Sequence, residues 1–178
     1  MADDWPAAQV RAAVSENGET VVRVIPGTSI GDTYGFAGAA KGKFASAQLL
    51  RFRDDRYVLY QTVALANPVA PIHVAVANDG TLITLDNWHN VGFGDIVVIY
   101  APDGKLRRKY RLEDLYPAAR MAKIRRSTSS IWWRCVGQDP AVQRNGTVQV
   151  DEALGGRFTF FLETGAFRYD AGAGACRP

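Results

Sequence analysis

Hydrophobic and polar residues alternate along much of this chain, and the alternation is clearest in residues 71–112. Within residues 72–76, Ile and Val stand at every second position, which is typical of a half-buried β-strand. The continuous apolar run at residues 96–100 is too short for a helix and predicts a strand buried on both faces. Residues 105–112 alternate again with basic side chains on one face, which predicts an exposed edge strand protected from pairing by its charges.

Glycine-containing turns separate these runs and recur along the chain. Asp-Gly pairs at residues 79–80 and 103–104 tolerate the positive φ that a tight hairpin requires. Asn-Gly pairs at residues 17–18 and 145–146 stand in front of similar strand-like runs. From this repetition we predict an all-β fold of antiparallel meanders in one domain, residues 1–178. Its three loosely repeated four-stranded units cover about residues 8–65, 71–112 and 131–170.

The middle unit resembles one blade of a β-propeller of the NHL and YVTN repeat type. The resemblance is carried by the order strand, Asn-Asp-Gly, strand, loop, strand, Pro-Asp-Gly, strand in residues 71–112, and it extends loosely to the flanking units. Propellers typically close with about four to eight blades. Since this chain offers three units, we expect a sandwich- or barrel-like fold, with an incomplete propeller-like arrangement as the alternative.

Two segments depart from the strand pattern. Residues 112–124 show apolar spacing near that of a helix, and Pro117 suits the first turn of a helix, so we predict one short helical segment there. Residues 26–44 are rich in Gly, Ser, Thr and Ala and form a long loop. For residues 6–14 a helix competes with a strand, but the Asn-Gly turn that follows favours a hairpin.

Composition narrows the class of protein. A chain of 178 residues with 47% hydrophobic and 22% charged residues is ordinary for a soluble globular domain. No apolar run approaches the roughly 20 residues that span a bilayer. A net charge of +3 is too small to indicate nucleic acid by itself, and the basic clusters at residues 105–111 and 120–126 suit either a solvated face or an anionic partner.

Cys135 and Cys176 are the only cysteines, and this count suits an exported protein with one disulfide. Two unpaired thiols in a cytosolic protein are the alternative. The residues after Met1 are consistent with a mature N-terminus to which a start methionine was added, so we expect a periplasmic or secreted protein whose signal peptide has been removed. The sequence lacks the Cys and His spacing of zinc sites, and we expect neither metal nor cofactor.

The loop at residues 86–95 is the most chemically varied stretch. Its candidate binding residues are Asp86, Asn87, Trp88, His89, Asn90 and Asp95. Function concentrates on loops held by a rigid scaffold, so one interpretation is a recognition loop with Trp88 and His89 as contacts. The other is a structural loop, in which the polar residues cap backbone donors and Trp88 plugs the end of the sheet.

Trp132 and Trp133 complete the candidate binding residues. If residues 131–136 form a strand, the two indoles point to opposite faces. One then belongs to the core, and the other is covered by a loop or forms a contact surface, where tryptophan is enriched.

These features favour a non-enzymatic exported module that binds a protein partner through its loops, an inhibitor or immunity-type protein being one form of it. A small hydrolase or lyase that uses His89 with nearby carboxylates is an alternative, although the nucleophile-elbow motif of α/β-hydrolases is absent. A structural envelope protein is a third. We expect no nucleic-acid partner, and the sequence leaves the oligomeric state open.

Overall fold

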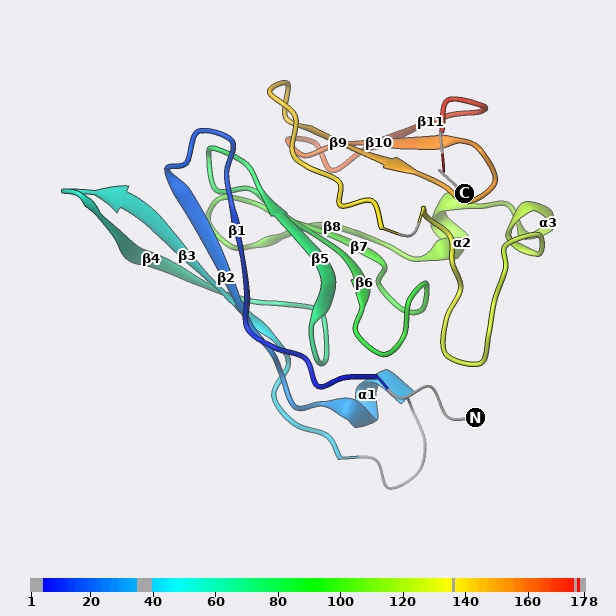
Figure 1. The fold of residues 1–178 in the computed structure, drawn as a ribbon, viewed down its shortest axis with the longest axis horizontal. Coiled ribbons are helices and arrows are strands. Elements are labelled where there is room, and N and C mark those ends of the chain that lie inside the picture. The colour runs from blue at the N-terminus through cyan, green and yellow to red at the C-terminus, as the bar shows by residue number, and fades with distance from the viewer. Residues whose placement is uncertain (1–4, 35–39, 136, 175, 177–178) are drawn as a thin grey trace.

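Three antiparallel sheets follow one another along the chain in the computed structural model (Figure 1). The structure describes residues 5–34, 40–135, 137–174 and 176; the expected mature N-terminus at residues 1–4 lies outside them. The first sheet has the order β1-β2-β3-β4. Its strands are β1 (Arg11–Val14), β2 (Thr20–Ile25), β3 (Ser46–Arg53) and β4 (Arg56–Ala64).

The middle sheet has the order β5-β6-β7-β8 and the third sheet the order β11-β10-β9. The middle strands are β5 (Pro71–Val76), β6 (Leu82–Asn87), β7 (Val97–Tyr100) and β8 (Leu106–Tyr110). The third sheet contains β9 (Thr147–Asp151), β10 (Arg157–Phe161) and β11 (Phe167–Asp170). The predicted all-β meander is therefore confirmed, with β8 at an edge as its charges suggested.

The third unit has three strands rather than the predicted four. Residues 131–135 form isolated bridges instead of a strand, at Ile131 with Arg126 and at Arg134 with Glu152. The reason is that the Trp133 indole and the Arg134 guanidinium both turn to the carboxylate of Asp86 on the middle sheet. Val136, which ended the predicted strand, lies outside the described residues.

Helices are few and short. α2 (Leu112–Leu115) and α3 (Ala118–Met121) lie where a helical segment was predicted, and α1 (Ile30–Tyr34) lies in the long loop at residues 26–44. Residues 35–39 of that loop are outside the described part. No helix among the described residues has both the length and the apolar character needed to cross a membrane.

The predicted hairpin turns are present. Gly18, Gly80, Gly104 and Gly146 all have positive φ, between 72° and 95°. The β3–β4 turn reaches the same region without glycine, since Asp54 and Asp55 have φ of 50° and 59°. Aspartate tolerates this conformation better than most residues, and two such residues in succession suit a tight hairpin.

The middle sheet is buried on both faces. Ile83, Leu85, Val97 and Ile99 pack towards the third sheet, in a cluster that includes Phe158 and Phe160 of β10. The alternate residues Leu82, Val98 and Tyr100 pack towards the first sheet, in a cluster with Val22 and Leu49. This confirms the strand predicted from the apolar run at residues 96–100, which is at most 2% exposed throughout.

The sheets are thus successive layers, and the described strands form no closed barrel. Figure 1 shows the first sheet and the third sheet on opposite sides of the middle one. Three meanders packed face to face in chain order resemble neighbouring propeller blades more than a barrel.

A disulfide and a buried carboxylate hold the C-terminal tail. Cys135 and Cys176 are bonded as predicted, and the Cys176 sulfur lies 3.5 Å from the Glu152 carbonyl. The Glu152 carboxylate is fully buried and accepts hydrogen bonds from Arg120, Tyr116, Tyr169 and two backbone N–H groups. Burial opposes its charge, but the backbone donors and the Arg120 guanidinium together lower the pKa of Glu152.

Candidate functional site

The loop at residues 86–95 begins with a buried carboxylate. Asp86 is 0% exposed and has a φ of 59°. Its Oδ1 accepts hydrogen bonds from Trp133 Nε1 at 2.7 Å and from the Gly92 backbone at 3.0 Å, and its Oδ2 accepts one from Arg134 Nε at 2.6 Å. Asp86 therefore ties the end of β6 to a segment almost 50 residues further along the chain.

Amide and carboxylate groups close the rest of the loop. Asn87 Nδ2 donates to the Phe93 carbonyl at 2.8 Å, and Asn87 Oδ1 accepts from Asn67 at the same distance. The Asn90 backbone donates to the Asn87 carbonyl. The Asp95 carboxylate lies 2.8 Å from Lys109 Nζ. The side chains of Asp86, Asn87 and Asp95 therefore all have partners within the fold.

Trp88 is only 8% exposed. It packs with Val69 and Ala70, and its Nε1 donates to the Pro6 carbonyl at 2.9 Å. The Trp5 ring meets it edge-on at 5.7 Å between centroids. A recognition residue would need a partly exposed indole, so the burial of Trp88 corresponds to the plug.

His89 follows Trp88 with a φ of 71° and is half-buried. Its ring centroid lies 5.7 Å from that of Trp5, and burial lowers the pKa of the imidazole. Both Asp86 oxygens already accept hydrogen bonds, and Asp95 is in an ion pair. No observation therefore favours the alternative of a hydrolase or lyase built on His89 and these carboxylates.

The two adjacent tryptophans differ in environment. Trp133 is 0% exposed and belongs to the core between the middle and third sheets. Trp132 is half-buried, with the Arg125 guanidinium carbon 4.9 Å from its ring centroid. One indole is thus in the core and the other is at the surface, although the segment is not the strand from which this was predicted.

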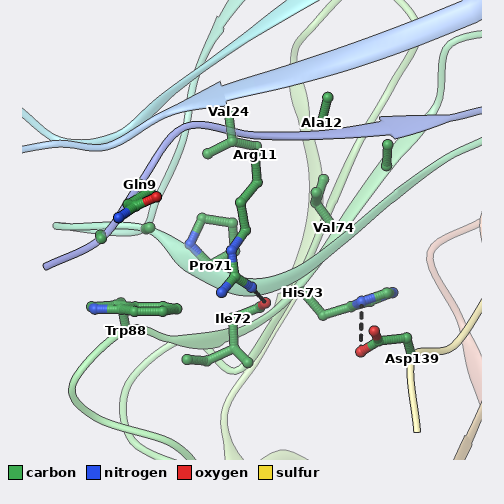
Figure 2. Close-up of a pocket in the computed structure, with 13 residues that line it drawn as sticks. Gln9, Arg11, Ala12, Val24, Pro71, Ile72, His73, Val74, Trp88 and Asp139 are labelled. Carbon is green, nitrogen blue, oxygen red and sulfur yellow. Dashed lines mark hydrogen bonds and ion pairs between the residues drawn. The ribbon is translucent and has the colours of Figure 1, made fainter. Parts of the chain in front are cut away.

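A cleft lies beside this loop, where the edges of the first and middle sheets meet. It has a volume of about 220 Å³ and is bordered by β1, β5, Trp88 and Asp139 (Figure 2). β1 and β5 each pair with one strand of their own sheets, so both present an edge here. Edge strands carry backbone N–H and C=O groups that have no neighbouring strand.

Arg11 extends from β1 into the cleft (Figure 2). Its Nη1 donates to the Ile72 carbonyl at 3.1 Å, and its guanidinium carbon lies 4.9 Å from the centroid of the Trp88 ring. Cation–π contact and one hydrogen bond hold the guanidinium in place. A guanidinium has five N–H donors, and the bond to Ile72 engages one of them among the described residues, so Arg11 can also meet an acceptor that enters the cleft.

His73 and Asp139 form the opposite end of the cleft. His73 Nδ1 lies 3.3 Å from an Asp139 oxygen, and Nε2 lies 2.6 Å from the Pro140 carbonyl. Burial lowers the pKa of His73 and outweighs these two oxygen neighbours, which raise it. The cleft therefore has a cationic end at Arg11 and an acidic, exposed end at Asp139.

The sequence indicated none of Arg11, His73 or Asp139 as a site residue. Arg11 lies in a short alternating run at residues 10–14 and His73 lies in a predicted strand, but their proximity depends on how two sheets meet edge to edge. Among the described residues, no group of three or more His, Cys, Asp or Glu side chains is placed to hold a metal ion.

No family model and no curated protein matches this chain. Among solved structures, the chain is similar to HIRA residues 644–1017, with 8% sequence identity and a TM-score of 0.43. The match covers 93% of this chain and 54% of the HIRA chain, so this chain spans about half the length of that neighbour. At this distance the likeness supports no functional conclusion.

Proposed function

We propose that this protein is a non-enzymatic binding module that holds an extended segment of a protein partner in the cleft between β1 and β5. The supporting observation is that two sheet edges meet at a cleft with a fixed guanidinium in it. An extended peptide that aligns with an exposed strand edge gains backbone hydrogen bonds, and side-chain pockets then supply specificity.

The charges of the cleft select the ligand. A carboxylate of the bound segment pairs with Arg11, since a planar guanidinium binds carboxylates through two parallel hydrogen bonds. The exposed Asp139 disfavours a second acidic residue at the other end. Ile72 provides an apolar wall beside the buried Trp88 ring. The partner segment is therefore extended, with one acidic residue next to apolar ones.

The disulfide indicates the kind of compartment in which the protein works. Disulfides persist in oxidising compartments, so the Cys135–Cys176 bond supports our proposal that the protein is exported to the periplasm or beyond. An inhibitor or immunity-type role towards a secreted enzyme is one form that such binding takes.

Panning a phage-displayed library of random peptides against the folded, oxidised protein tests the proposal. We expect enriched peptides to share an acidic residue and to bind at least about tenfold more weakly to Arg11→Glu, because the charge that selects them is reversed. Arg23→Glu is the matched control, since Arg23 is also an exposed arginine of the first sheet but does not line the cleft.

Amide chemical shifts recorded with an enriched peptide locate its site. We expect shift changes confined to the backbone amides of β1 and β5 and to the indole N–H of Trp88. Peptides that lose equal affinity to both variants, or that shift amides elsewhere, contradict the proposal.

A further inference from the structure

The β3–β4 hairpin carries an exposed apolar surface that lies apart from the cleft. The hairpin projects from the body of the molecule, with β4 at the outer edge of the first sheet (Figure 1). Tyr57, Val58 and Leu59 follow one another on β4 and are 43%, 40% and 48% exposed. An edge strand of nine residues with this composition is unusual in a protein that stays monomeric.

The apolar surface continues across the outer face of the same sheet. The register places Val14, Val21, Leu50 and Leu59 opposite one another, in a row that crosses all four strands. Their sequence neighbours Val22 and Leu49 pack inward on the middle sheet, so this row points outward. Phe52 and Tyr57 form the next pair on the same face, with ring centroids 5.3 Å apart.

The two outer edges of the first and middle sheets differ in their protection. β8 carries Arg107, Arg108 and Lys109 in succession, and charges of this kind prevent an edge from pairing with another chain. β4 has the sequence RYVLYQTVA, in which Arg56 at the first position is the only charged residue. The edge of β4 therefore lacks the feature that keeps the edge of β8 single.

We propose that β4 pairs antiparallel with β4 of a second copy of this chain, so that a two-fold axis joins two four-stranded sheets into one of eight strands. A second copy fits because the strand is self-complementary in this direction. The single charge, Arg56, then lies at opposite ends of the paired strands, and like charges do not face each other. A two-fold interface uses the same patch on both copies.

The pairing also sets the two apolar faces side by side in one continuous sheet face. Leu59 and Tyr57 of one copy become cross-strand neighbours of the β4 residues of the other, so apolar side chains that each monomer exposes are partly shielded in the dimer. β4 is nine residues long, but its register with β3 shifts between Leu49 and Leu50, so the ladder between the two copies is interrupted near Tyr60. The cleft between β1 and β5 lies at the opposite edge of the sheet and remains open.

Analytical ultracentrifugation of the full oxidised chain over a range of concentrations tests this inference. We expect a reversible monomer–dimer equilibrium, and we expect Leu59→Lys to weaken dimerisation at least about tenfold because it places two lysines within the pairing. Leu106→Lys is the matched control: Leu106 is 52% exposed on the edge strand β8, so the same change at similar exposure should leave dimerisation unaltered.

Hydrogen exchange of the unmodified protein gives a second measurement that needs no variant. Protection of the β4 amides should rise with protein concentration, while that of the β8 amides stays constant. A monomer at all concentrations, a dimer that Leu59→Lys and Leu106→Lys affect alike, or a β4 edge that only an unrelated protein protects would each overturn the inference. Peptide binding by Leu59→Lys reports on the cleft separately.

Discussion

The loop at residues 86–95 and the β3–β4 hairpin differ in opposite ways from what their sequences suggest. The loop has the most varied side chains in the chain, yet Asp86 and Trp88 in it are buried and hydrogen-bonded. The hairpin has plain alternating residues and no motif, yet it carries the exposed apolar surface. Chemical variety and accessibility are therefore separate properties.

The loop and the hairpin differ because they belong to different layers of the three stacked sheets. The loop closes one end of the sheet that is buried on both faces, and buried polar groups there need partners, so its carboxylates and amides serve the fold. The hairpin belongs to an outer layer whose inner face is covered by the middle sheet. No described element covers its outer face, so apolar side chains such as Tyr57 and Leu59 stay exposed there.

The largest loss of stability should follow Asp86→Ala. The substitution leaves Arg134, whose side chain is 10% exposed, and the Trp133 indole without their acceptor. Removing one partner of a buried ion pair costs roughly 3–5 kcal/mol. Asp55→Ala is the control, because Asp55 shares the φ of 59° but is exposed. Urea unfolding that gives similar losses for both would show that the backbone, and not the carboxylate, matters at Asp86.

The second-largest loss of stability should follow Trp88→Ala. Truncating a plug that packs with Val69 and Ala70 costs about 3 kcal/mol. Trp132→Ala removes an indole of equal size that is half-buried and in contact with Arg125, and it should cost about 1 kcal/mol or less. A thermal melt in which Trp88→Ala behaves like Trp132→Ala would contradict the structural role of Trp88.

Acidification should have a smaller effect, through His73. Burial lowers the pKa of His73 in the folded protein below its ordinary value of 6.5, so the folded state binds fewer protons than the unfolded state. The stabilisation is therefore present above about pH 6.5 and is lost as the pH falls through the folded pKa. Melting temperatures at pH 7.5 and 5.5 should differ less in His73→Gln than in the unmodified protein. An equal difference would assign the acid sensitivity to His89 or to carboxylates.

The sequence predicted the fold better than the site, and particular residues show why. Strands and turns follow local rules, so the glycines at 18, 80, 104 and 146 and the apolar run at residues 96–100 were sufficient to place two sheets. The run at residues 131–135 failed as a strand because Trp133 and Arg134 bind Asp86, a contact that spans almost 50 residues. No local pattern contains such a contact.

The cleft depends on a contact of the same kind. Arg11 and Trp88 are 77 positions apart in the chain and meet only because β1 lies beside β5. Disulfide pairing was easier to predict, since with two cysteines only one bond is possible within the chain.

The smallest effect should come from Leu59→Ala, compared with Leu49→Ala on the adjacent strand of the same sheet. Leu49 is 0% exposed on the inner face and its truncation should cost about 3 kcal/mol, whereas Leu59 is 48% exposed and its truncation should stay within about 0.5 kcal/mol at low protein concentration. A partner that binds only the folded state stabilises it by mass action. A second copy bound at β4 therefore makes the unmodified protein more stable as the protein concentration increases. The loss of unfolding free energy caused by Leu59→Ala should then grow with protein concentration. The loss caused by Leu49→Ala should include about 3 kcal/mol from the core at every concentration. A large loss for Leu59→Ala in dilute solution would instead mean that the outer face of the first sheet is already covered within one chain, and the contrast between the buried loop and the open hairpin would no longer hold.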